Sequence, residues 1–100
     1  MNPIKRLAKA ITQLHGCKAR HVESVPVKEI FRGKVAWQGV VEVFSITGHP
    51  KAKRCYAWNH LDGDKDEKTR IVTVLELPPV DSPQTAVKAA IMSQARAEKN

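Results

Sequence analysis

One continuous stretch, from Thr47 to His60, holds the residues with the clearest chemical character. It begins with a Gly-His-Pro turn, continues with a short basic cluster, and then alternates in the manner of a β-strand. Because successive strand side chains point to opposite faces, the basic and aromatic members share one face: Arg54, Tyr56, Trp58 and His60. Cations contact phosphates and rings stack on bases, so this face favours nucleic-acid binding.

A second basic and aromatic group, formed by Arg32, Lys34 and Trp37, precedes this stretch. If the strands on either side of Gly48 pair with each other, Lys34 lies at the end far from Lys51, so one continuous patch is not required. The residues predicted to bind nucleic acid are Arg32, Lys34, His49, Lys51, Lys53, Arg54, Tyr56 and Trp58. A competing interpretation places the two rings in the core, because aromatic side chains more often pack than bind ligands.

Neither a catalytic constellation nor a metal-binding motif is recognisable. Residues 62–66 (Asp-Gly-Asp-Lys-Asp) resemble the start of an EF-hand calcium loop, but Glu67 and Thr73 stand where that loop requires glycine and glutamate. We interpret residues 62–67 as a polar hairpin loop. Two histidines and two cysteines lack the paired spacing of zinc ligands: His15, Cys17, His21 and Cys55. We therefore expect no enzymatic activity, no metal and no cofactor.

The positive charge is concentrated in the first part of the chain. The 100 residues carry a formal net charge of +7. Residues 1–60 hold eleven lysines and arginines against three glutamates, whereas residues 61–100 hold six against seven acids. Such a field attracts phosphate backbones without implying a sequence preference.

Cysteine content and hydropathy describe the expected environment. Two cysteines are too few for a disulfide-stabilised scaffold. No apolar run approaches the ~20 residues of a membrane span, and no hydrophobic block follows the N-terminal charges as in a signal peptide. We expect a cytoplasmic protein with free thiols and no membrane partner.

The acid-free first 22 residues also resemble a mitochondrial transit peptide, but they are poor in serine and arginine, so we interpret them as a structural helix.

These residues must be positioned by a small set of elements. The spacing predicts a helix over residues 3–15, because Asn2 is a suitable N-cap, apolar residues recur at three- and four-residue steps, and Gly16 is a suitable C-cap. Residues 17–24 are interpreted as a connector. Residues 25–31 are interpreted as a short strand or an extended arm at a sheet edge.

Three longer strands are expected to follow, at about residues 35–47, 52–61 and 69–77. The first does not keep one apolar register, which indicates either a bulge at Gly39 or a strand with both faces covered. A second helix is predicted over about residues 82–97, capped by its first serine and with proline at the next position.

This order predicts a single α+β domain over residues 1–100, with two layers arranged αβββα. The sheet is expected to be antiparallel and three-stranded, with a possible extra short strand near the N-terminus. Both helices are expected to cover one face, which leaves the other face open to solvent or to a partner.

The order helix, three strands, helix resembles the double-stranded RNA-binding domain. Residues 48–53 (Gly-His-Pro-Lys-Ala-Lys) look like that family's loop between its first two strands, and the alanine-rich helix from Ser82 is similar to its closing helix. The resemblance implies that three residues enter the minor groove of duplex RNA: His49, Lys51 and Lys53. It also makes RNA the expected partner over DNA. The family's lysine cluster at the start of its last helix has no counterpart here, where a single lysine stands.

Self-association, or binding of a protein partner, is the alternative function. The uncovered sheet face would then be the interface, with Trp37, Tyr56 and Trp58 as its anchors, because aromatic residues dominate interface energetics. Charge reversal at the basic turn would abolish nucleic-acid binding and barely affect such an interface. Alanine at Trp58 would have the opposite effect.

Overall fold

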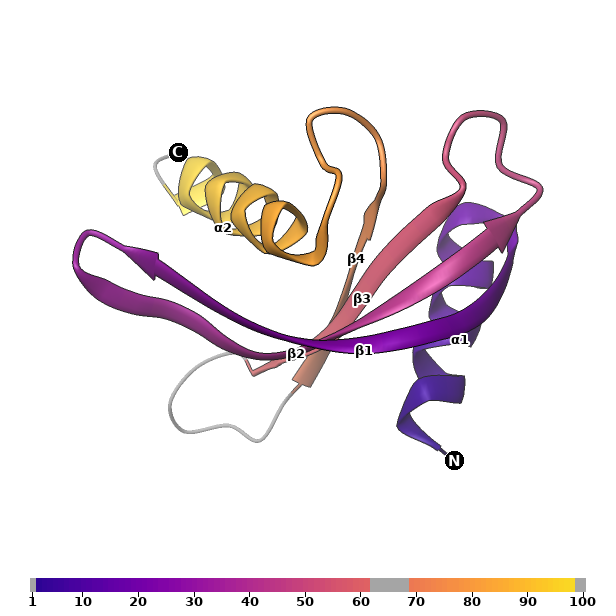
Figure 1. The fold of residues 1–100 in the computed structure, drawn as a ribbon, viewed down its shortest axis with the longest axis horizontal. Coiled ribbons are helices and arrows are strands. Elements are labelled where there is room, and N and C mark those ends of the chain that lie inside the picture. The colour runs from indigo at the N-terminus through magenta and orange to yellow at the C-terminus, as the bar shows by residue number, and fades with distance from the viewer. Residues whose placement is uncertain (1, 62–68, 99–100) are drawn as a thin grey trace.

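The computed structural model describes residues 2–61 and 69–98, which form two helices and four strands (Figure 1). In chain order they are α1 (Pro3–His15), β1 (Lys18–Phe31), β2 (Lys34–Thr47), β3 (Arg54–Leu61), β4 (Thr69–Leu75) and α2 (Pro83–Glu98). The strands form one antiparallel sheet in the order β1-β2-β3-β4. The predicted α+β class is confirmed, while the hairpin loop predicted at residues 62–67 lies outside the described residues.

Helix α1 begins and ends at the predicted residues. The Asn2 side chain accepts a hydrogen bond at 2.8 Å from a backbone N–H of the first turn, which satisfies one of the free donors at the helix start. Gly16 adopts the left-handed conformation, with a φ of 67°, and its N–H donates to the Thr12 carbonyl at 2.9 Å. The buried residues of the apolar stripe are Leu7 and Ile11.

Strand β1 is the main difference from the predicted element order. It starts at Lys18, which pairs with Thr47, and it remains paired with β2 up to Phe31. Residues 17–24 are therefore not a connector, and the sheet has four strands instead of three, with a 14-residue strand at its edge. Most side chains of this strand are exposed, so the apolar alternation that identifies a strand is weak.

Two one-residue β-bulges adjust the β1–β2 hairpin. Val22 is the extra residue in β1, and Ala36 is the extra residue in β2. The bulge expected at Gly39 is not there, because Gly39 pairs regularly with Val27. A Cβ atom at Gly39 would lie 2.8 Å from the Trp37 ring, so glycine at this position makes room for the indole.

Residues 41–46 of β2 contribute buried side chains to both faces of the sheet. Val41 and Val43 belong to the core beneath α2, whereas Phe44 and Ile46 belong to the core beneath α1. The alternation is therefore regular, and the apolar residues keep no single register because both faces are apolar. Over residues 41–46, this confirms the interpretation of a strand covered on both faces, whereas Val35 and Val40 in the outer half are exposed.

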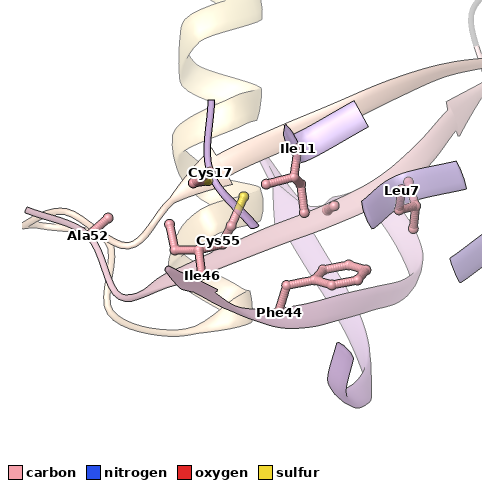
Figure 2. Packing of buried hydrophobic residues seen from close by; sticks show 8 residues of the cluster. Leu7, Ile11, Cys17, Phe44, Ile46, Ala52 and Cys55 are labelled. Carbon is pink, nitrogen blue, oxygen red and sulfur yellow. The ribbon is translucent and has the colours of Figure 1, made fainter. Parts of the chain in front are cut away.

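The two helices lie on opposite faces of the sheet, and each has its own hydrophobic core. The α1 core, shown in Figure 2, consists of Leu7, Ile11, Cys17, Phe44, Ile46, Ala52, Cys55 and Ala57. The α2 core consists of Val27, Val41, Val43, Tyr56, Trp58, Val80, Ala86 and Val87. The arrangement differs from the predicted two layers with both helices on one face. Because β2 and β3 are apolar on both faces, each face needs its own helix.

Helix α2 starts where the sequence predicts. The Ser82 Oγ accepts a hydrogen bond from the Thr85 N–H at 3.2 Å. The Thr85 Oγ1 in turn accepts from the N–H groups of Asp81 and Ser82 at 2.9 and 3.0 Å. Within the described residues, neither helix is long and apolar enough to cross a membrane.

Candidate nucleic-acid interface

Two rows of cross-strand neighbours expose cations at one end of the sheet. In the first row, Arg20 of β1 pairs with Ser45 of β2, and Ser45 pairs with Arg54 of β3. In the next row, Lys18 pairs with Thr47. Paired residues of an antiparallel sheet share a face and place their Cβ atoms about 5 Å apart. All five side chains are exposed, so three cations lie close together with two hydroxyl groups between them.

This surface continues the sheet face that α2 covers. Val43 and Tyr56 pair with each other and belong to the α2 core. Ser45 and Arg54 lie two residues further along the same strands, which returns them to the same face. Helix α2 therefore leaves this end of the sheet open.

The loop between β2 and β3 presents two exposed lysines at this end of the sheet. Ala52 is 2% exposed and packs in the α1 core, and the Lys53 carbonyl accepts a hydrogen bond from the Ile46 N–H at 2.9 Å. These contacts hold the loop against the body of the protein, while Lys51 and Lys53 on either side of Ala52 are exposed. We define the basic patch as the five cations at this end of the sheet: Lys18, Arg20, Lys51, Lys53 and Arg54.

His49 shapes the backbone of this loop. Its Nδ1 accepts hydrogen bonds from the N–H groups of Lys51 and Ala52, at 3.0 and 2.8 Å. A ring nitrogen that accepts two hydrogen bonds carries no proton, so the proton of the neutral ring is on Nε2. The geometry gives His49 a positioning role, because it orders the backbone that carries the two lysines.

Replacing His49 with alanine is expected to lower the free energy of unfolding by about 1–2 kcal/mol, because two backbone donors lose their acceptor. His49→Asn should keep most of the stability, since the Asn Oδ1 can accept from the same backbone groups. Urea unfolding of both variants measures the difference. A stability of His49→Ala equal to that of the wild type would show that the loop does not depend on this side chain.

Tyr56 and Trp58 lie in the α2 core and not on an exposed surface. They are 1% and 2% exposed, and Trp58 packs against Trp37 with ring centroids 5.6 Å apart. The Tyr56 hydroxyl donates a hydrogen bond to Glu76. Burial, and after it this bond to Glu76, raises the pKa of Tyr56 well above its ordinary value. A buried ring is not available to stack on a base, so the binding role predicted for these two rings is wrong and the competing core interpretation is confirmed.

Arg32 and Lys34 lie at the opposite end of the hairpin from the basic patch. They flank Gly33 in the turn between β1 and β2 (Figure 1), whereas the patch lies at the far end of the 14-residue strand β2. The Arg32 guanidinium lies 5.2 Å from the centroid of the Phe31 ring. The cations predicted from the sequence therefore form two separate basic regions.

Lys18 and Arg20 belong to the basic patch but are absent from the predicted site. Their signal is the alternation of residues 18–21, in which the two cations share one face while Ala19 packs against the α1 core. The bulge at Val22 ends this alternation after four residues. Such a short pattern does not distinguish a strand from a polar loop.

The C-terminal end of α1 contacts the sheet through His15. Its Nε2 lies 2.9 Å from the Thr73 Oγ1 in β4. Burial, and after it the coulombic influence of His49, holds the pKa of His15 below its ordinary value of 6.5. His15 is therefore a neutral hydrogen-bonding group of the folded protein at neutral pH.

This environment predicts a pH-dependent stability that His15→Gln removes. The unfolded chain takes up a proton on His15 near pH 6.5, whereas the folded protein does so only at lower pH. The contribution is therefore complete above about pH 6.5 and is lost as the pH falls below it. We expect the urea midpoint to drop less in His15→Gln than in the wild type between about pH 7 and about pH 5. Equal drops in the two proteins would contradict the assignment.

In the part of the chain that the structure describes, no three His, Cys, Asp or Glu side chains lie close enough together to hold a metal ion. Cys17 and Cys55 are free thiols buried in the α1 core (Figure 2). Burial, and after it the neighbouring Cys17, raises the pKa of Cys55 to about 12.

Near β1, the Ser24 Oγ and the Glu42 Oε1 both contact the same His21 nitrogen, Nε2, at 3.4 and 2.8 Å. A catalytic triad uses both ring nitrogens, so this cluster does not have the geometry of one.

Comparison with protein-family models, with curated proteins and with solved structures finds no match for this chain. The charge, exposure and backbone geometry of the basic patch are therefore the observations from which a function is inferred.

Proposed function

We propose that this chain is a small, non-enzymatic protein that binds the phosphate backbone of nucleic acid through the basic patch. The observation that carries the proposal is the row in which the exposed Arg20 and Arg54 flank Ser45 on one sheet face. Strand pairing holds their backbones in place, so the cations are spaced in advance of binding. Lys18 extends this positive surface on the same face, and the exposed Lys51 and Lys53 of the loop add charge at the same end of the sheet.

The chemistry of the patch suits phosphate groups better than bases. Arginine presents a planar set of donors that matches phosphate oxygens, and lysine contributes a compact charge. The hydroxyl groups of Ser45 and Thr47 add neutral donors between these cations. No Phe, Tyr or Trp side chain of the described residues is exposed within the patch. Binding is therefore expected to be electrostatic, with little preference for sequence.

A carboxylate defines the β4 side of the patch. The Glu76 N–H donates to the Arg54 carbonyl at 2.9 Å, and the Glu76 carboxylate accepts the hydrogen bond of Tyr56. This negative charge disfavours a phosphate on the β4 side of Arg54. A bound backbone is therefore expected to run over β1, the end of β2 and the loop of residues 48–53.

Fluorescence anisotropy with labelled duplex RNA, duplex DNA and single strands, at low salt, tests the proposal. We expect binding whose affinity varies little among duplexes of equal length and different sequence. The resemblance to the double-stranded RNA-binding domain makes RNA the preferred class of partner. A folded protein that binds none of these at low salt would refute the proposal.

The anchors named for a self-associating module lie beneath α2. Tyr56 and Trp58 are buried there, and Trp37 is half-buried against Trp58. Besides the end of the sheet that carries the basic patch, the outer half of the β1–β2 hairpin also has side chains that the helices leave uncovered.

A further inference from the structure

The outer half of the β1–β2 hairpin exposes a group of large apolar side chains. Ile30, Phe31, Val35 and Val40 are 57%, 43%, 50% and 48% exposed. They account for four of the seven large hydrophobic residues that are exposed in the described part of the chain. A fifth, Met92 of α2, lines a shallow hollow together with Phe31. We define the hairpin tip as Ile30, Phe31 and Val35 together with the turn between them, whereas Val40, which pairs with Pro26, lies further back on the same ribbon.

The tip is exposed because the sheet narrows toward it. Strand β2 pairs with β3 only over residues 42–45, whereas its pairing with β1 continues out to Lys34. The outer half of the hairpin is therefore a two-stranded ribbon that extends away from the rest of the sheet (Figure 1). Helix α2 covers one face of this ribbon, where Val27 is buried in the α2 core.

Cations surround these apolar side chains. Lys28, Arg32 and Lys34 are exposed, and the Arg32 guanidinium lies over the Phe31 ring at 5.2 Å. The one carboxylate between residues 26 and 41 belongs to Glu29, which is buried and accepts a hydrogen bond from the Gln84 side chain. The exposed surface of the tip is therefore apolar and positively charged.

We propose that the hairpin tip inserts its apolar side chains into the surface of an anionic lipid bilayer, while its cations bind the lipid headgroups. Burial of apolar side chains and attraction to anionic headgroups are the two contributions that hold proteins at a membrane surface. Arginine and lysine beside an inserted apolar group keep their charges at the headgroup level. This binding does not depend on the basic patch, and it needs no membrane-spanning segment.

Other occupants fit the hairpin tip less well. Even with Val40 counted, the half-exposed side chains of the ribbon offer roughly 300 Å² for burial, well below the ~800 Å² that each partner buries in a stable protein interface. A symmetric contact with a second copy would also bring two sets of cations together. Aliphatic side chains gain nothing from phosphate oxygens, so the tip suits a nucleic-acid backbone less than a lipid surface.

Co-sedimentation with vesicles tests the proposal. We expect the wild type to bind vesicles of phosphatidylcholine mixed with phosphatidylglycerol more strongly than vesicles of phosphatidylcholine alone. The double variant Ile30→Ser/Phe31→Ser should bind the mixed vesicles about tenfold more weakly or worse. The variant Arg32→Gln/Lys34→Gln should lose most of the preference for phosphatidylglycerol. All four side chains are exposed, and circular dichroism tests whether the variants fold.

Leu14→Ser is the matched control, because it removes an apolar side chain that is 65% exposed on α1. It should bind vesicles like the wild type. The Ile30→Ser/Phe31→Ser variant should also keep its affinity for RNA, which separates this proposal from the proposed function. Absence of vesicle binding by the wild type, or an equal loss in Leu14→Ser, would overturn the proposal. A wild-type dimer that the double variant converts to a monomer in light scattering would assign the tip to self-association instead.

Discussion

Replacement of Lys51, Lys53 and Arg54 with glutamine is expected to weaken nucleic-acid binding on the order of a hundredfold at about 0.1 M salt. Each phosphate contact with a duplex releases close to one counterion, so three lost contacts remove between two and three powers of ten from the affinity at that salt concentration. All three side chains are exposed, so the change should leave the fold intact. Anisotropy with labelled duplex RNA measures the dissociation constants.

Lys5, Arg6 and Lys9 provide a control with the same loss of net charge. They are exposed on α1, which packs on the sheet face opposite to the one that carries Arg20 and Arg54. Their replacement with glutamine should weaken binding less than about tenfold, because distant exposed charges act only through the screened field of the protein. Equal losses in the two triple variants would show that net charge, and not the basic patch, determines binding.

Trp58→Ala is expected to lower the free energy of unfolding by about 3–5 kcal/mol. Trp58 is 2% exposed and packs on Trp37 and the residues beneath α2, so truncation leaves a large cavity. A loss of this size is a substantial fraction of the 5–15 kcal/mol that is typical of small domains. Urea or thermal unfolding, followed by circular dichroism, measures the effect.

Trp37→Ala is the comparison for this second result. Trp37 contacts Trp58 but is only half-buried, so its loss should destabilise the protein less. Under conditions in which Trp58→Ala remains folded, its affinity for RNA should equal that of the wild type. An unchanged stability combined with lost RNA binding would mean that the Trp58 ring is a binding surface and not part of the core.

Local signals in the sequence were sufficient for most elements. The N-cap at Asn2 and the left-handed glycine at Gly16 set the bounds of α1, and Ser82 sets the start of α2. Strands β2, β3 and β4 are predicted from their apolar residues, most of which are buried or partly buried in the structure. These features depend on near neighbours in the chain, which is why the sequence alone reveals them.

The features that the sequence did not reveal depend on contacts between distant residues. The first half of β1 is a polar edge strand interrupted by the Val22 bulge. Its amino-acid composition does not identify it as a strand, whereas its pairing with β2 does. The alternation of Arg54, Cys55, Tyr56 and Ala57 separates two faces but does not say which face a helix covers. Helix α2 covers the Tyr56 face but not the end of the sheet at which Arg20 and Arg54 lie, so these two stay exposed while the rings are buried.

The measurement that tests the central proposal most directly is a salt titration of duplex RNA binding by the wild type and by the Lys51→Gln/Lys53→Gln/Arg54→Gln variant. Five cations in contact with phosphates give a slope of about −4.5 for the logarithm of the association constant against the logarithm of the salt concentration. The variant should show a slope of about −1.8, because two cations of the basic patch remain. Equal slopes for the two proteins, or an affinity that does not change with salt, would contradict binding through the basic patch.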